Sequence, residues 1–395
     1  MLAAEVLALG PGLALTRSDQ GLVRFFTCSD GAEALHSWRQ WKREHPLDAA
    51  SFAEMRMLPA AALRLVELGA DDADLGRMQG LARYFWLWTQ RATRASVESA
   101  TALAERGVEV VALKGLALHA LGAMSPVERP ITDGDLLLSA GLEPVAGLLR
   151  SRGFRVQRRQ AHAWTAARGE REEIDLHRFP LHQDRRSRQH TLASATGLPN
   201  APWRVPSPAD LVLHACLHGV RRTSSPGWVL DVRRIVARFP VDWSELVERA
   251  RARRFALILC DTLRVVADVL PPAVLAALEG SPVTGLEALE YARIAAGSGP
   301  WHAAAGAAAH TLRGLRATHA RLDDELMARA AQRGRLQWRH GWASEWQRVE
   351  PVRGGRDAGA QAAGLHTSEL RAPELHASGA PALCAPAIDA PEPHA

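Results

Sequence analysis

The chain has 395 residues, of which 47% are hydrophobic and 23% charged, and its formal net charge is +5. This balance is typical of a globular protein and argues against a mainly disordered or membrane-embedded chain. The four cysteines are scattered without a CxxC spacing, which argues against a zinc ribbon or a disulfide framework.

The N-terminal part of the sequence predicts helices. Residues 1–48 receive no assignment, but their apolar start lacks the basic region of a signal peptide and the length of a membrane span, so we expect a cytoplasmic protein with no membrane partner. In residues 49–107 apolar side chains recur at three and four spacing, as in Leu81, Phe85 and Trp88. This segment is predicted to be a helical lead-in.

Residues 108–180 mix short strands with short helices. The β-branched run VEVVAL ends at Lys114-Gly115, and LALHALG follows, which predicts a strand, a tight turn and a helix. A strand at 132–138 and a helix at 142–152 come next. Further strands are expected at 154–157, 164–167 and 173–177. The predicted fold class is α+β, with a small mixed sheet and helices.

The remaining sequence is predicted to be helical and then disordered. After Pro180 we expect a loop up to Ser207, which would cap a helix that has Pro208 in its first turn. Residues 207–350 form a C-terminal helical region, with a last helix at 283–309. Residues 351–395, rich in Gly, Ala and Pro, are predicted to be a disordered tail.

Three aspartates suggest a metal site. Asp133 and Asp135 are two residues apart, so on one strand their carboxylates project from the same face and repel unless a cation lies between them. Magnesium takes such oxygen ligands and leaves positions for phosphates. Asp175 completes the site if its strand is a neighbour. Three carboxylates can hold one or two metal ions that serve phosphoryl chemistry.

Basic residues near these aspartates are candidates for nucleotide binding. Lys114 is one of only two lysines in the chain, and it stands with Gly115 at the start of a predicted helix. Backbone amides and positive charge at that position suit phosphate oxygens. Arg129, shortly before the Asp pair, is a further candidate.

The ordered set of these segments carries a resemblance to a known family. The motifs LKGLAL, RPITDGDLLL, the helix end at Gly153-Phe154, IDLH, LVLHACLHGV, WVLDVRRI and DWSELVERARA are similar to bacterial uncharacterised nucleotidyltransferases of the DNA polymerase beta superfamily, over about residues 58–270. The resemblance implies a polymerase-beta-type nucleotidyltransferase core at 108–180, flanked by N- and C-terminal helical regions.

The resemblance also implies an activity. The chain would transfer a nucleoside monophosphate from an NTP, such as ATP, to an acceptor and release pyrophosphate, with Mg²⁺ or Mn²⁺ as cofactor. Asp133 and Asp135 would hold the metal and the triphosphate, while Asp175 would deprotonate the acceptor hydroxyl or bind a second metal. The acceptor, whether small molecule, protein or RNA, is not readable from the sequence.

Two departures from the family pattern keep an alternative open. Gly134 stands where an aliphatic residue is usual, and glycine weakens a strand. Lys-Gly replaces the superfamily's Gly-Ser turn, although it does so throughout this family. The alternative is a non-catalytic module that binds nucleotide or RNA; a third hypothesis is a toxin-like transferase. Metal-dependent turnover separates the enzyme from the module.

Three histidines are candidates for acceptor contact or for supporting the acids. His177 follows Asp175 by two residues and would share its strand face, whereas His214 and His218 lie four apart on a predicted helix without the glutamate of HExxH. Structural hydrogen bonding is the competing explanation for all three. Arginine clusters leave nucleic-acid contact open; they lie at 150–159, 185–188, 221–222 and 249–254.

Overall fold

The computed structural model describes residues 2–8, 15, 17–160, 162–181, 187–219, 226–285, 287–288 and 291. The predicted tail at 351–395, most of the helix predicted at 283–309 and the arginine pair at 221–222 lie outside these residues. Among the described helices, none combines the length with the apolar character that a bilayer crossing requires.

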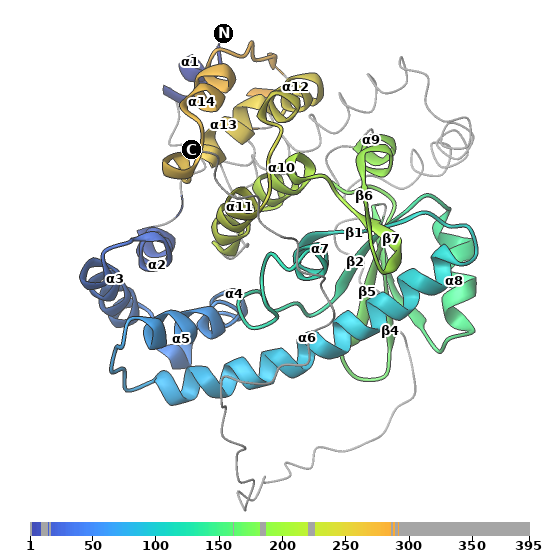
Figure 1. The fold of residues 1–395 in the computed structure, drawn as a ribbon, viewed down its shortest axis with the longest axis horizontal. Coiled ribbons are helices and arrows are strands. Elements are labelled where there is room, and N and C mark those ends of the chain that lie inside the picture. Colours follow the sequence, from blue (N-terminus) through green and yellow to red (C-terminus); the bar gives the residue numbers. More distant parts are fainter. Residues whose placement is uncertain are drawn as a thin grey trace, which may run out of the picture. The chain divides into compact units, whose positions relative to one another are not determined.

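A mixed sheet forms the centre of the described fold, which confirms the α+β class (Figure 1). Seven described strands have the order β3-β4-β5-β2-β1-β7-β6. β2 is antiparallel to β1 and parallel to β5, and β1 is parallel to β7. The strands are β1 (Val110–Ala112), β2 (Gly134–Leu138), β3 (Arg155–Arg159), β4 (Ala163–Arg168), β5 (Glu172–His177), β6 (Thr196–Leu198) and β7 (Ala201–Val205).

The long helix α6 (Leu75–Ala104) packs on this sheet through β1, β2, β5 and β7 (Figure 1). Its buried face carries small residues, including Ala92, Ala95, Ser96 and Ser99. Small side chains let the helix approach the strands closely, and Gly134 of β2 lies directly against Ser96. The glycine that departs from the family pattern is therefore explained by packing.

The helices that connect the strands are short. α7 (Lys114–Ala120) follows β1, α8 (Leu142–Arg150) follows β2, and α9 (Ser187–Ser194) precedes β6. The strands predicted at 154–157, 164–167 and 173–177 correspond to β3, β4 and β5. The strand predicted at 132–138 begins two residues later, at Gly134.

The prediction of a loop between Pro180 and Ser207 was wrong, because this segment contains α9, β6 and β7. β7 is short and has a proline at its second position, so its sequence has little of the strand pattern. It is a strand because it pairs with β1, through Val111 and Arg204, and with β6. Such pairing between distant segments leaves little trace in local sequence.

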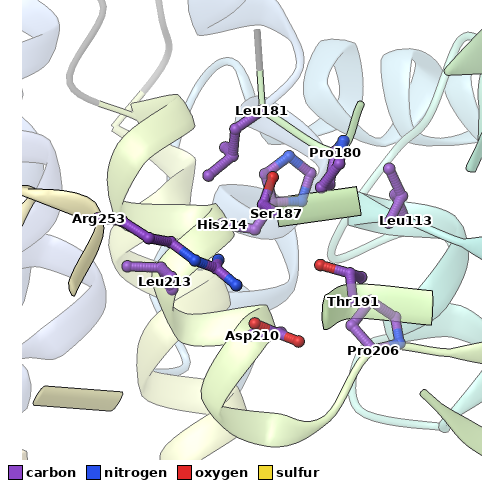
Figure 2. Close-up of a pocket in the computed structure, with 10 residues that line it drawn as sticks. All are labelled: Leu113, Pro180, Leu181, Ser187, Thr191, Pro206, Asp210, Leu213, His214 and Arg253. Carbon is purple, nitrogen blue, oxygen red and sulfur yellow. The ribbon is translucent and has the colours of Figure 1, made fainter. Parts of the chain in front are cut away.

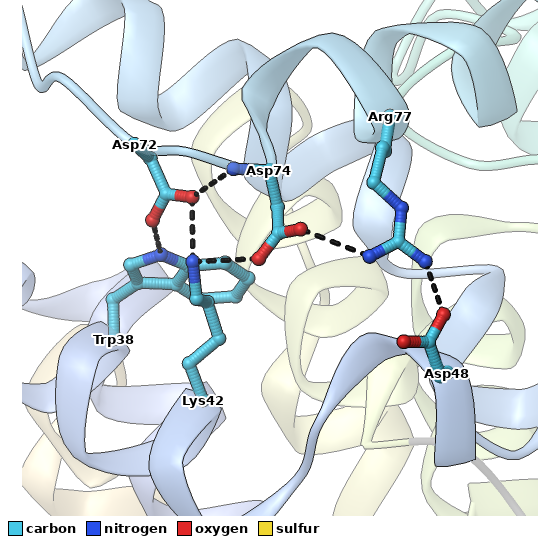
Figure 3. Close-up of polar contacts among 6 residues, drawn as sticks. All are labelled: Trp38, Lys42, Asp48, Asp72, Asp74 and Arg77. Carbon is cyan, nitrogen blue, oxygen red and sulfur yellow. Dashed lines mark hydrogen bonds and ion pairs between the residues drawn. The ribbon is translucent and has the colours of Figure 1, made fainter.

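Residues 2–8 and 17–74 are mostly helical. Trp38 and Trp41 form a second apolar core with Phe25, Leu65 and Met78. Trp38 Nε1 also donates to Asp72, which accepts from Lys42 (Figure 3). The helices are α1 (Ala3–Ala8), α2 (Arg17–Thr27), α3 (Gly31–Glu44), the 3₁₀ turn η1 (Leu47–Ala49), α4 (Phe52–Met55) and α5 (Leu58–Glu67).

The described part of the C-terminal region is helical, as predicted. Ser207 Oγ accepts from the backbone N–H of Asp210 at 3.2 Å, so Ser207 is an N-terminal cap as expected. α1 packs against α13 and α14 of this region. Its helices are α10 (Pro208–Gly219), α11 (Gly227–Arg238), α12 (Trp243–Arg253), α13 (Ala256–Arg264), the 3₁₀ turn η2 (Ala267–Val269) and α14 (Pro272–Glu279).

Candidate functional site

Asp135 and Asp175 lie directly opposite each other on the neighbouring parallel strands β2 and β5. Side chains that face each other across adjacent strands share one side of the sheet. Asp135 is 5% exposed, so its carboxylate is almost fully removed from water. A buried carboxylate needs hydrogen bonds or a cation, and the partners of Asp135 are therefore informative.

Asp135 has two described partners. The Lys114 ammonium contacts Asp135 Oδ1, and His177 Nε2 donates to the same oxygen at 2.8 Å. Burial opposes ionisation of Asp135, but the Lys114 charge and the His177 hydrogen bond outweigh it and hold the pKa of Asp135 well below its usual range. In turn, the charges of Asp135 and Asp133 overcome the effect of burial and raise the pKa of Lys114.

Asp175, Asp135 and His177 together form a candidate metal site. One potential ligand atom from each residue lies within 4.8 Å of the others. Thr165 of β4 donates to Asp175 Oδ1 at 2.6 Å and so orients this carboxylate. Nδ1 of His177 is buried and has no hydrogen-bond partner among the described residues. Two carboxylates and an imidazole suit a divalent cation.

Asp133 stands immediately before β2 and is not part of this group of three. Thr132 Oγ1 donates to its carboxylate at 3.2 Å. Burial, followed by the neighbouring charge of Asp135, raises the pKa of Asp133 to about 6. The charge of Asp135 thus disfavours ionisation of Asp133, although the strand begins only after Asp133. The metal-binding role expected of Asp133 stays a prediction.

Lys114 and Gly115 form the first turn of α7, which is separated from β1 by Leu113 alone. Lys114 has a φ of 50°, in the left-handed region that side chains rarely adopt. A Cβ on Gly115 would lie 2.3 Å from Cγ2 of Ile131, so only glycine fits beside that residue. This turn delivers the ammonium to Asp135. The phosphate contacts expected of Lys114 and Gly115 stay a prediction.

Residues 129–131, which precede Asp133 and Asp135, are fixed by hydrogen bonds with several helices. Arg129 Nε donates to both carboxylate oxygens of Asp231, at 2.8 and 3.1 Å. His119 contacts the carbonyl of Arg129, and Thr89 exchanges hydrogen bonds with the backbone of Ile131. Asp231 is thus an ion-pair partner of Arg129. The nucleotide contact expected of Arg129 stays a prediction.

Arg56 is a basic residue of this region that the sequence reasoning missed. It stands just after α4 and donates through Nη2 to the carbonyl of Pro130 at 2.8 Å. Its guanidinium interacts electrostatically with Asp133 and Asp135. No motif surrounds Arg56, and its approach to the site depends on how the lead-in helices pack, so no sequence signal could have found it.

His214 and His218 lie on α10, with ring centroids 5.9 Å apart. His214 lines a small pocket together with Leu113, Asp210 and Arg253 (Figure 2). The pocket has a volume of about 10 Å³, room for about one water molecule and far too little for a nucleoside. The acceptor roles considered for both histidines stay predictions.

One known protein family matches the part of the chain that contains the sheet and the acidic residues described above. The family described as uncharacterised nucleotidyltransferase matches residues 53–271. The match includes the whole sheet, Arg56 and Asp231. No curated protein matches the chain.

Proposed function

Because the chain belongs to the uncharacterised nucleotidyltransferase family, we propose that it transfers a nucleoside monophosphate from an NTP, such as ATP, to a hydroxyl of an acceptor. The observation that carries this proposal is the register of β2 and β5, which sets Asp135 opposite Asp175. An enzyme that moves a nucleotidyl group needs such paired acids to hold cations against a triphosphate.

Asp135 and Asp175 would hold Mg²⁺ or Mn²⁺, together with His177 or Asp133. A bound divalent ion neutralises phosphate charge and lowers the pKa of a coordinated hydroxyl. The chain's own groups then have separate tasks. Thr165 fixes the orientation of Asp175, and Lys114 offsets the charge of Asp135.

The reaction is an in-line displacement at the α-phosphorus. The acceptor oxygen forms a bond to this phosphorus while the bond to the bridging oxygen between the α- and β-phosphates breaks, and pyrophosphate leaves with that oxygen. The hydroxyl proton would pass to water, or to Asp175 if this carboxylate acts as the base instead of as a metal ligand. Catalysis then depends on positioning and charge neutralisation.

One observation favours a second candidate, a non-catalytic module that binds nucleotide or RNA. Lys114 and His177 both bind the same oxygen of Asp135, and an ammonium at that position competes with a metal ion. A module of this kind binds nucleotide without releasing pyrophosphate. Gly134 does not favour the module, since close packing against Ser96 accounts for it.

The test is label transfer from each α-labelled NTP in the presence of Mg²⁺ or Mn²⁺. A cell extract supplies acceptors, and both pyrophosphate and the labelled species are measured. The variants are the double Asp133→Ala, Asp135→Ala and the single Asp175→Asn. Asp268→Asn is the matched control, because Asp268 is an exposed acid paired with Arg233 outside the site.

Metal-dependent labelling by the wild-type protein and by Asp268→Asn, but not by the site variants, supports the enzyme, and the labelled species identifies the acceptor class. If every NTP leaves the acceptors unlabelled while nucleotide still binds, the non-catalytic module replaces the enzyme. Labelling that persists in the site variants would rule out this site as the source of activity.

A further inference from the structure

Arg56 reaches the acidic site from the N-terminal helices. It follows α4, whose first turn is fixed by a capping box between Ser51 and Glu54, and it precedes the buried residues Met57 and Leu58 of the next turn. Both flanking elements are thus anchored. Arg56 is half-buried, so the packing around it restricts where its guanidinium can lie.

Two guanidiniums meet at one backbone oxygen beside the site. Arg56 Nη2 and Arg129 Nη1 both donate to the carbonyl of Pro130, at 2.8 and 3.5 Å. Asp231 pairs with Arg129, whereas the Pro130 contact is the one hydrogen bond that the described residues offer the Arg56 guanidinium. Nε of Arg56 is buried and has no hydrogen-bond partner in the described part of the chain. A guanidinium has five N–H donors, so most of this one's capacity is unused.

The charges around Arg56 leave room for an anion. Burial and the like charge of Arg129 lower the pKa of Arg56 to about 10, although Asp133, Asp231 and Asp135 act in the opposite direction. Divalent cations bound to Asp133 and Asp135 would cancel that opposing effect. Among the described residues, Asp231 would then be the one carboxylate without a cation beside the two guanidiniums, and it already pairs with Arg129. An added oxyanion would relieve the excess positive charge.

We propose that Arg56 binds the polyphosphate of the substrate, with its free N–H groups donating to non-bridging oxygens of the β- or γ-phosphate and of the pyrophosphate product. This inference rests on the proposed function for the identity of its ligand. Guanidinium matches phosphate oxygens in two-pronged geometry and is the usual choice for a partly buried phosphate contact. The lead-in helices thereby contribute to the active site.

A purely structural role for Arg56 is the competing explanation, because its bond to Pro130 ties α4 to the segment before Asp133. Arg64 provides a matched control. It also belongs to the lead-in helices, donates to a backbone carbonyl (Cys28, 3.1 Å) and has a buried Nε without a hydrogen-bond partner among the residues that the structure describes. Unlike Arg56, it pairs with a surface acid, Glu67, and has no described contact with the site.

The experiment measures binding of inorganic tripolyphosphate, with Mg²⁺, to the full chain by calorimetry. The proteins are wild type, Arg56→Gln, Arg56→Lys and Arg64→Gln, and urea unfolding reports the stability of each. We expect Arg56→Gln to weaken binding at least tenfold. Arg56→Lys should weaken it less, since lysine keeps the positive charge but cannot donate two parallel hydrogen bonds as a guanidinium does. Arg64→Gln should lower stability without changing affinity. If Arg56→Gln does not fold, Arg56→Lys carries the comparison.

The outcomes separate this inference from the proposed function. Equal tripolyphosphate affinity of wild type and both Arg56 variants would leave Arg56 as an anchor, and so would equal weakening by Arg64→Gln. A wild-type protein that labels acceptors but does not bind tripolyphosphate would overturn the inference alone. Arg56-dependent binding without label transfer from any NTP would keep the inference and overturn the transferase.

Discussion

Gly134 and Ser96 stand so close that no side chain fits between them. A Cβ on Gly134 would lie 1.7 Å from Ser96 Oγ and 2.5 Å from Ser96 Cβ. Ser96 belongs to α6 and Gly134 opens β2, directly between Asp133 and Asp135. The contact therefore sets how deeply the acidic strand sits on the long helix.

Gly134→Ala should destabilise the protein by about 1–3 kcal/mol or more, because the added methyl overpacks the helix–sheet interface. Urea unfolding measures the change. Gly147→Ala is the control, since Gly147 lies within α8 with nothing within 4 Å of its added Cβ; this substitution should be neutral or stabilise by up to about 1 kcal/mol. The double variant Gly134→Ala, Ser96→Gly should regain part of the loss. No recovery would mean that Ser96 is not the obstacle.

Thr165→Val should weaken metal binding by about 10–100-fold, as losses of residues that orient metal ligands do. Valine keeps the shape of threonine but cannot donate to Asp175, whereas Thr165→Ser keeps the hydroxyl and should restore most of the affinity. Mn²⁺ titration measures the affinity. Thr262→Val removes a buried hydroxyl from α13 that bonds only within its helix, and should leave the affinity unchanged. An unchanged affinity for Thr165→Val would show that Asp175 needs no such support.

Lys114→Met should make the protein more dependent on divalent cations. The variant leaves buried Asp135 without its ammonium, a loss that costs about 3–5 kcal/mol for a buried pair. Mg²⁺ should stabilise Lys114→Met more than it stabilises wild type. The rise in melting temperature on adding Mg²⁺ should therefore be larger for the variant than for wild type. Arg234→Gln, which breaks a surface pair with Glu128, is the control and should respond like wild type. Identical Mg²⁺ responses would contradict an exchange between the ammonium and the metal.

Asp72→Asn should destabilise the protein near neutral pH by about 1.5–3 kcal/mol, the usual worth of a hydrogen bond to a charged group. Burial opposes ionisation, but hydrogen bonds from Lys42 and Trp38 outweigh it and lower the pKa of Asp72 (Figure 3). The stabilisation is therefore present above the ordinary aspartate pKa of about 4 and is lost as the pH falls through the lower folded value.

Urea unfolding at pH 7, 5 and 3 measures this dependence. The gap between wild type and Asp72→Asn should narrow toward pH 3, and a constant gap would contradict the ionic origin. Asp48→Asn is the control, because Asp48 also pairs with a basic side chain, that of Arg77, but is 84% exposed. Its effect should stay within about 0.5 kcal/mol at every pH.

Local patterns were sufficient to predict the α+β class and most strands of the sheet. The β-branched run before Lys114 corresponds to β1, which is buried throughout, and the alternation around Asp175 corresponds to β5, where buried Ile174 and Leu176 flank the partly exposed aspartate. Patterns could not predict β7, which is a strand because it pairs with β1 and β6. They also could not show that His177 contacts Asp135 or that Arg56 approaches the site, because both contacts depend on register and helix packing between distant segments.

The order of the strands also determines when this site can form during synthesis. The ribosome releases β2 before α8, β3, β4 and β5, and β1 gains its second neighbour only with β7. Until β5 has emerged, Asp135 has neither Asp175 opposite it nor the hydrogen bond from His177. A polypeptide that terminates prematurely before β5 therefore lacks the acidic centre altogether, and pairing of such distant strands makes the centre a late product of folding.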